Sequence, residues 1–399
     1  MIKKLITFIV LLTSAEFFTL FIFSEDTIKI VEAAVIIFLF IALLNKVLFF
    51  KEVNKHRYTD NFKKGVLLIL LGVFVSIMPA YLYHSQPPEI TLVTQRAMYY
   101  YLLFFYLYKY KIDEKYLKKI IIVMATLYSA VYFGALINVN LVQPSIQAKV
   151  LEERETTRLA IPGILYIIVA FFISLDKIVA EKKYLYFSFF LIFLANAITT
   201  GTRAVIFSLG ILTMLYLMKS LRKGRLLATT LVLAAIVLGG FYFYEILRSS
   251  YDLLIQASTL EEGNIQVRLA TASYFLEDFF PNNLTYVLGN GLASQLTDYG
   301  QEILYYKLFY GFYQSDIGIV GEYISYGVFY LLGVIVIIYT ILKNRKFIAS
   351  KYILYPFYYI IISMITTPHF GIPSHITGIC LLLYLANKSI RANQKYLIK

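Results

Sequence analysis

Long apolar runs, separated by short charged segments, recur from one end of the chain to the other. Most are close to the ~20 residues with which a helix crosses a bilayer core about 30 Å thick. With their charged breaks, they predict twelve membrane-spanning helices, near residues 4–23, 28–45, 65–83, 91–108, 120–138, 159–175, 184–200, 204–218, 226–247, 320–342, 352–367 and 374–387. The pattern therefore predicts an all-α polytopic membrane protein, with a single integral membrane domain over residues 1–399.

The first run follows Lys3 and Lys4, as the apolar region of a signal peptide would. It has no small-x-small cleavage site, and it contains Glu16. We therefore expect a retained membrane anchor rather than a segment that is removed.

Composition excludes two broad classes of protein. The 399 residues are 59% hydrophobic and only 15% charged, with a mean hydropathy of +0.70, whereas soluble domains are nearer half apolar and a quarter charged. A soluble enzyme and a disordered chain are therefore both excluded. The single cysteine, Cys380, lies in a late apolar run, so no disulfide framework exists.

Positive charge is distributed unequally between the two sides that the twelve runs define. With both termini on one side, that side collects 28 of the 37 Lys and Arg residues, whereas the other side holds nine of them and 18 of the 24 acidic residues. Because Lys and Arg are enriched in cytoplasmic loops, both termini are predicted to be cytoplasmic. The net charge of +13 then reflects topology, and no nucleic-acid partner is expected.

The longest connection, residues 248–318, lies between the ninth and tenth runs on the outer side. It predicts a large extracytoplasmic loop, and long loops of this kind are usually functional. Apolar side chains recur in it at helical spacing, which predicts two amphipathic helices packed on the membrane surface. These side chains are Ile265, Leu269, Ala272, Leu276 and Phe280, then Ile303, Tyr306, Phe309 and Tyr310. The pair Asn290-Gly291 predicts a turn between the two helices.

Arginine dominates the outward basic residues. Six of the nine are arginines, whereas only five of the 28 cytoplasmic ones are. The six are Arg96, Arg154, Arg158, Arg203, Arg248 and Arg268. Lysine and arginine serve topology equally well, so the outer side favours the guanidinium group itself. Its planar fork binds phosphate through two parallel hydrogen bonds, which predicts an anionic substrate.

Some of these arginines allow a second interpretation. Arg154 and Arg158 lie beside three glutamates, in a segment that is either a solvated charged loop or a ligand site. Arg248 either anchors a helix at the lipid headgroups or binds the substrate. Arg96 lies about five residues inside an apolar run, where an unpaired arginine costs roughly 2.5 kcal/mol or more. It must therefore snorkel, pair or face a polar cavity.

Two carboxylates close the long loop. Asp316 is a candidate general base or sugar-binding group, and Glu322 is either a partner for an outer arginine or a substrate ligand. His84, His369 and His375 have no metal-ligand spacing, so they are assigned to turns and loops. Neither a metal site nor another cofactor is expected.

Three short segments between about residues 185 and 335 resemble a known family. Thr199-Thr200-Gly201-Thr202-Arg203-Ala204 is similar to the T-G-[ST]-R turn of Wzy-type O-antigen and capsule polymerases and of O-antigen ligases. Arg268, Pro281 and Gly289-Asn290-Gly291 resemble the R…P…G-x-G stretch of their large periplasmic loop. Ser315-Asp316-Ile317-Gly318, followed by Gly327-Val328-Phe329-Tyr330, resembles the exit from that loop. The order, spacing and membrane side of the three segments agree.

The resemblance implies a GT-C-like, metal-independent glycosyltransferase in the bacterial cytoplasmic membrane. Its substrate would be oligosaccharide linked to undecaprenyl diphosphate at the outer leaflet. The resemblance implies membrane lipid as one partner and a chain-length regulator protein as another. Carried over by residue, Arg203 and Arg268 bind the diphosphate, and Asp316 occupies the place of the histidine base of the ligases. That difference favours a repeat-unit polymerase over a ligase-like transferase.

A flippase of lipid-linked oligosaccharide is the alternative from another class, since twelve spans and basic character fit it as well. Flippases have short loops and charges spread along their central helices. Here the charges gather at the outer side and one loop is long. The sequence therefore favours chemistry at the outer face.

Overall fold

The structure is a computed structural model that describes residues 2–47, 60–144, 159–200, 203–221 and 266–397, together with residues 229, 230, 232–234 and 236. Within these ranges the chain is helical and contains no β-strand, apart from one isolated bridge between Leu20 and Val142. The predicted all-α class is therefore confirmed.

A helix occupies each predicted apolar run that the structure describes. The first part of the chain contains α1 (Ile2–Ser14), α2 (Glu25–Val47), α3 (Asp60–Val75), α4 (Ile77–His84), α5 (Pro88–Thr94), α6 (Leu102–Tyr110), α7 (Glu114–Ile137), α9 (Ile164–Val179), α10 (Tyr186–Thr199) and α11 (Arg203–Leu221). The later part contains α14 (Asn283–Leu288), α15 (Asp298–Tyr310), α16 (Ile319–Lys343), α17 (Lys351–Ser363) and α18 (Pro373–Leu397). The run predicted at 226–247 falls largely outside the described residues.

Shorter helical segments join several of these helices. Those of 3₁₀ type are η1 (Glu16–Thr19), η2 (Gln95–Tyr101), η3 (Val139–Leu141), η6 (Gln314–Ile317) and η7 (Arg345–Phe347), and η5 (Tyr274–Asp278) is a π-helical turn. Five helical stretches are long and apolar enough to cross a membrane: Glu25–Leu44, Asn61–His84, Glu114–Ile137, Ala204–Leu221 and Ile319–Lys343. They indicate a membrane-embedded helical protein.

Some helices differ in their bounds from the predicted runs. The run at 4–23 is helical only to Ser14, because Glu16–Thr19 have φ values between 49° and 58°. This left-handed turn cannot continue a right-handed helix. The run at 91–108 is broken by η2 between α5 and α6, and the run at 374–387 is part of the longer helix α18.

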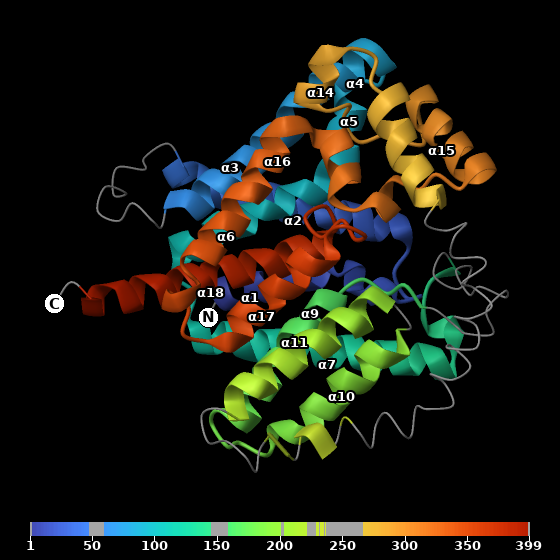
Figure 1. Ribbon diagram of the computed structural model, residues 1–399. Coiled ribbons are helices and arrows are strands. Elements are labelled where there is room, and N and C mark those ends of the chain that lie inside the picture. The colour runs from blue at the N-terminus through green and yellow to red at the C-terminus, as the bar shows by residue number, and fades with distance from the viewer. Residues whose placement is uncertain are drawn as a thin grey trace.

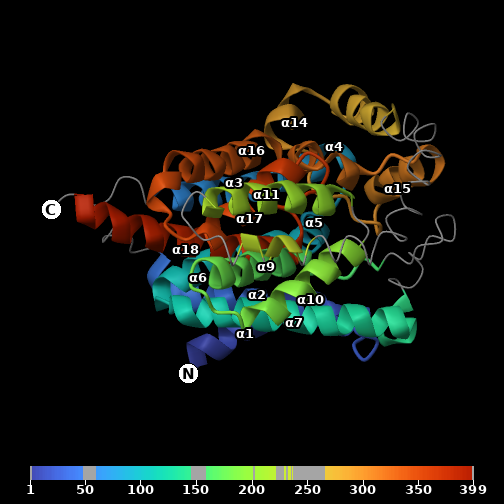
Figure 2. The same ribbon diagram turned by 60° about the horizontal axis from the view of Figure 1, so that its bottom comes forward.

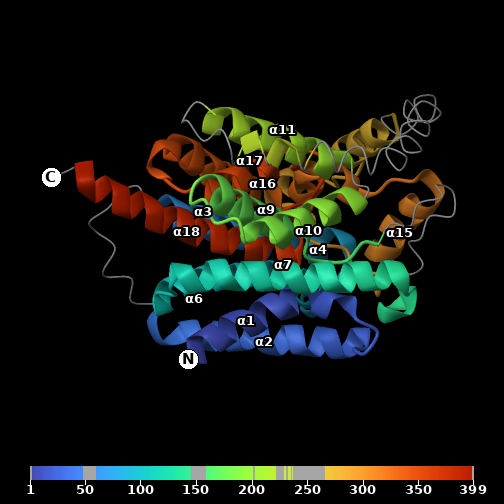
Figure 3. The same ribbon diagram turned by 90° about the horizontal axis from the view of Figure 1, so that it is seen from below.

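The long helices lie side by side in one bundle, and the two ends of this bundle differ (Figures 1, 2 and 3). Both chain termini lie towards one end, whereas α15 lies at the other (Figures 2 and 3). Near the termini, Lys3 Nζ donates to Tyr110 O over 3.2 Å, and Tyr352 OH donates to Glu114 Oε1 over 2.9 Å. Segments that the charge distribution assigns to one side therefore contact one another, in agreement with the alternation of the predicted runs.

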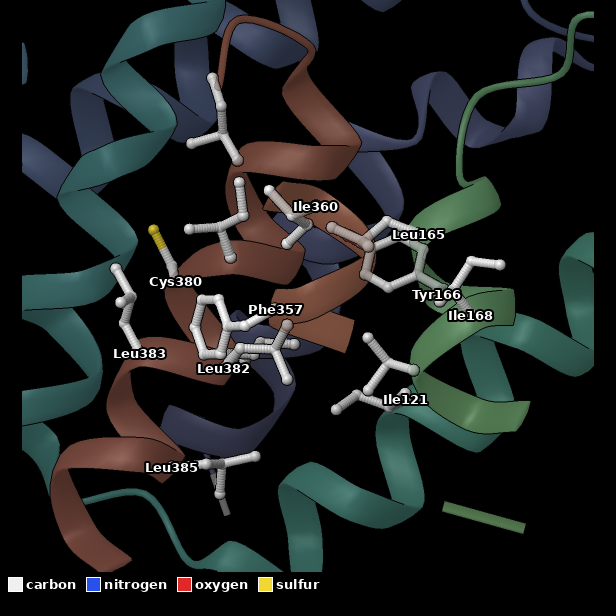
Figure 4. Close-up of a cluster of buried hydrophobic side chains, with 14 of the residues drawn as sticks. Ile121, Leu165, Tyr166, Ile168, Phe357, Ile360, Cys380, Leu382, Leu383 and Leu385 are labelled. Carbon is white, nitrogen blue, oxygen red and sulfur yellow. The ribbon is translucent and has the colours of Figure 1, made fainter. Parts of the chain in front are cut away.

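The core lies where α7, α9, α17 and α18 meet (Figure 4). Ile121, Tyr166, Phe357 and Cys380, one from each of these helices, are all at most 2% exposed. Nearly every residue of α9 is buried, as expected for a helix that is apolar on all sides. The buried thiol of Cys380 serves as part of this apolar packing.

Glycines bring α16 close to α3. A Cβ atom at Gly72 would lie 2.6 Å from Tyr330 N, and one at Gly333 would lie 2.6 Å from Gly65 O. Only glycine permits two helix backbones to approach this closely. The contact fixes the position of α16, the helix that follows the long connection.

Candidate functional site

Residues 266–318, here called the cap, lie at the end of the bundle away from the termini (Figures 1 and 2). Both helices predicted in the loop are present, as a helical stretch over 266–278 and as α15. Their apolar positions are only partly buried. Phe280 is 7% exposed, but Leu269 is 65% exposed and Phe309 is 72% exposed.

Gln86, in the short segment between α4 and α5, binds the cap to the bundle. It is fully buried, and its Nε2 donates to Leu292 O over 2.9 Å. Its Oε1 accepts from Ser294 N over 2.8 Å and from Thr297 Oγ1 over 3.0 Å. One buried amide therefore satisfies three polar groups of the cap, which makes it an effective anchor.

His84, the last residue of α4, makes a second connection to the cap. Its ring stacks on Tyr299 with centroids 4.1 Å apart, and its Nε2 is hydrogen-bonded to Asn290 Oδ1 at 3.1 Å. The sequence assigned His84 to a loop, but the structure shows that it is a docking residue. No sequence pattern connects His84 with Asn290, so the sequence carries no signal for this contact.

The glycine-rich segment of the cap fits against a kink in α16. Gly289 and Gly327 have φ values of 80° and 72°, which glycine adopts readily. A Cβ atom at Gly289 would lie 2.5 Å from Ser325 O, and Asn290 N donates to Ile324 O over 2.9 Å. The predicted turn is present, and its glycines allow the close approach of two backbones.

Arg268 and Asp316 lie on neighbouring segments of the cap. A Cβ atom at Gly311 would lie 3.8 Å from Val267 Cγ1, so the helix that carries Arg268 packs beside the turn that precedes Asp316. Both side chains are exposed. Asp316 Oδ1 accepts a hydrogen bond from Ser315 Oγ over 3.3 Å, and no contact between Arg268 and Asp316 is found among the described residues.

Arg203 is the first residue of α11, and its side chain is not among those described. Tyr132 OH donates to Thr199 O over 2.9 Å, so the end of α10 lies beside the last part of α7. The three remaining outward arginines of the long connections lie outside the described residues; they are Arg154, Arg158 and Arg248.

Arg96 is paired, which is one of the three outcomes that its place in an apolar run allows. Its Nε donates to Glu32 Oε2 over 2.8 Å, so that the ion pair joins η2 to α2. Glu32 is a partner that the sequence analysis missed. The two residues are 64 positions apart, and the periodicity of neither run indicates the contact.

Glu322 lies in the first turn of α16 and is only 5% exposed. The sequence left two roles open for it, a partner for an outer arginine or a substrate ligand. The carboxylate packs on the turn between α17 and α18, where a Cβ atom at Gly371 would lie 2.9 Å from Glu322 Oε1. No ion pair joins Glu322 to an arginine among the described residues, and the side chains of Arg154, Arg158, Arg203 and Arg248 lie outside them, so the arginine partner stays a prediction.

The turn between α17 and α18 also holds a histidine pair. His369 Nε2 is hydrogen-bonded to Ser363 Oγ at 2.6 Å, and His369 Nδ1 is 3.0 Å from His375 Nδ1. Burial lowers the pKa of His369 well below its usual range, and His375 adds to this effect, so His369 stays neutral and shares one hydrogen with its neighbour. The histidines thus stabilise the turn, and among the described residues no three His, Cys, Asp or Glu side chains are grouped.

No protein-family model matches this sequence, and no curated protein matches it. The resemblance to polysaccharide polymerases therefore rests on the residues of the three short segments.

The cap can perform two chemical tasks with its exposed side chains. Arg268 carries a permanent positive charge that can stabilise a departing phosphate group, and Asp316 can accept a proton from a hydroxyl group. Gln86 and the glycine contacts hold these residues on a segment that is fixed to the bundle. The cap therefore holds Arg268 and Asp316 in place as well as supplying their charges.

Proposed function

We propose that the protein is a polysaccharide repeat-unit polymerase at the outer face of the bacterial cytoplasmic membrane. It would have twelve spans, a GT-C-like fold and cytoplasmic termini, and it would join oligosaccharides carried on undecaprenyl diphosphate. The observation that supports the proposal is the exposure of Arg268 and Asp316 on neighbouring segments of a cap that is docked to the bundle. The bias towards arginine among the outward basic residues gives further support.

The chemistry of such a reaction needs few protein groups. A sugar linked to a diphosphate is already activated, so no nucleotide is required at the outer face. Arg203 and Arg268 would stabilise the departing diphosphate, and Asp316 would deprotonate the acceptor hydroxyl. Arg154, Arg158 and Arg248 are proposed to bind the anionic donor as well. Arg96 and Glu322 contact groups outside the cap and are considered separately below.

The proposal is tested with Arg203→Ala and Arg268→Ala in cells whose surface polysaccharide depends on this protein. Loss of one group that stabilises the leaving diphosphate is expected to slow chain growth about 10²-fold or more. Gel analysis should then show single repeat units in place of long polymer, at an unchanged protein level. Arg345→Ala is the matched control, because Arg345 is an exposed arginine near the opposite end of the bundle.

Asp316→Asn tests the proposed base in the same assay, with Asp298→Asn as its control on an exposed carboxylate of the cap. We expect short chains for Asp316→Asn and normal chains for Asp298→Asn. Long polymer in both arginine variants would disprove the polymerase proposal. Repeat units that accumulate only on the cytoplasmic side would favour the flippase alternative.

A further inference from the structure

Glu32 and Arg96 form an ion pair with unequal burial. The side chain of Glu32 on α2 is 3% exposed, whereas that of Arg96 on η2 is 31% exposed. The carboxylate is therefore inside the protein, and the guanidinium group extends from it towards the surface. A buried carboxylate in this position fixes the arginine, because separating the pair would leave an unpaired charge.

The ion pair uses only one edge of the guanidinium group. Nε donates to Glu32 Oε2 over 2.8 Å, and Nη1 makes one long contact of 3.4 Å with Val93 O. No other hydrogen bond of Arg96 is found among the described residues. The edge formed by the two terminal nitrogens is therefore available. Two parallel N–H groups on this edge match the oxygens of a phosphate group.

The 3₁₀ geometry of η2 explains why Arg96 points away from the core. In a 3₁₀ helix every third side chain lies on one face, and Gln95, Met98 and Tyr101 are all 0% exposed. Gln95 Nε2 also donates to Ser76 Oγ over 3.1 Å, which holds this face inward. Arg96 belongs to another face, which is directed at α2.

The surroundings of Arg96 are apolar and exposed. Val93, whose carbonyl oxygen is 3.4 Å from Arg96 Nη1, is 64% exposed. The spanning part of α2 is only 28% buried, and α2 lies at the edge of the bundle (Figure 3). Glu32 is about 10 Å along the helix from its start at Glu25, at 1.5 Å per residue. The pair is therefore placed about a third of the way along the stretch Glu25–Leu44, on a side that opens to lipid, at a depth from which a long arginine side chain snorkels towards the headgroups.

We propose that Arg96, held by Glu32, binds the phosphate group of a lipid in the outer leaflet. Phospholipids and isoprenoid phosphates share this chemistry. The site opens sideways to the membrane and contacts no described residue of the cap. It would bind lipid phosphate whichever reaction the protein catalyses, so its test does not depend on polymer formation.

Native mass spectrometry of the full-length protein in detergent can test the site, with the Kd of the first bound lipid as the measurement. The probes are phosphatidylglycerol, undecaprenyl phosphate and diacylglycerol, which lacks the phosphate. Both phosphate lipids are expected to bind at least about tenfold more tightly than diacylglycerol. The tighter of the two identifies the source of the phosphate. Equal Kd values for all three probes would overturn the proposal.

Arg96→Lys keeps the charge and removes the fork, so it should weaken binding of the phosphate lipids about tenfold. Lys29→Gln is the matched control, because Lys29 is an exposed cation on the same helix, paired with Asp26 at 3.3 Å. This control should change the Kd by no more than about twofold. An equal loss in both variants would mean nonspecific attraction and would contradict the site.

A double variant tests whether a loss of lipid binding results from misfolding. Glu32→Gln with Arg96→Gln replaces the ion pair by two amides and leaves no buried unpaired charge. The double variant should elute as a single species and lose its preference for phosphate lipids over diacylglycerol. If it keeps that preference, Arg96 is not the phosphate ligand.

Discussion

Glu32 and Glu322 are both buried carboxylates near the start of an apolar helix, but their neighbours differ. Glu32 has a guanidinium group 2.8 Å away. Glu322 packs against Gly371 and has no charged partner among the described residues. A charge that is moved from water into a protein costs several kcal/mol unless another charge compensates it. Glu32 is therefore part of an ion pair that must stay complete, whereas a neutral group could replace Glu322.

The difference also shows that position in the sequence does not predict which carboxylate pairs with an arginine. Both glutamates lie near the start of their apolar runs, and arginines on the outer side occur elsewhere in the sequence as possible partners for either. Only the packing of α2 against η2 brings one arginine within reach of one carboxylate. The following substitutions test the comparison, beginning with the largest expected effect.

Arg96→Gln should lower the free energy of unfolding by about 3 kcal/mol, the lower end of the range for a broken buried pair, because Arg96 is partly exposed. Unfolding in a titration from mild detergent to sodium dodecyl sulfate measures this change. Glu32→Gln in the same chain should restore most of the loss. A single variant as stable as the parent would show that Glu32 does not need its partner.

Gly371→Ala should lower the free energy of unfolding by about 2 kcal/mol, because the new Cβ atom overpacks the Glu322 carboxylate. The same titration applies. Gly210→Ala is a suitable control, since no atom lies within 4 Å of a Cβ at that position. If Glu322→Ala, which removes the carboxyl group, does not reduce the effect of Gly371→Ala, the clash involves another group.

Glu322→Gln should have the smallest effect and should leave stability unchanged or raise it by about 1 kcal/mol, because it replaces a buried carboxyl group that has no charged partner among the described residues by a neutral group of the same size. Comparing its unfolding midpoint with that of Arg96→Gln contrasts the two carboxylates directly. A loss as large as that of Arg96→Gln would reveal a partner for Glu322 and erase the difference.

Hydropathy predicts where the helices lie, because each membrane helix corresponds to a continuous stretch of apolar residues. It does not predict where they break. The left-handed turn at Glu16–Thr19 and the 3₁₀ segment η2 both occur inside apolar runs, where the local composition stays the same. These breaks depend on tertiary packing, which a periodic pattern does not contain.

For a related reason, the sequence predicted only part of the candidate site. The turn at Asn290-Gly291 and the exposure of Asp316 follow from local residue types, and both are present in the structure. The roles of Gln86, His84 and Glu32 depend on contacts across 64 to 215 positions of the chain. Such contacts leave no signal in one sequence, because a buried glutamine and an exposed one look alike in it.

The length of the rod formed by α3 and α4 sets the height of the cap. Residues Asn61–His84 make a helical stretch of 24 residues, which is about 36 Å long at 1.5 Å per residue. A hydrocarbon core of about 30 Å leaves roughly one helical turn above it. His84 and Gln86 attach the cap directly at this end of the stretch, so we expect the cap to lie at the level of the lipid headgroups. A lipid-linked substrate could then reach the cap while its diphosphate remains in the interfacial layer.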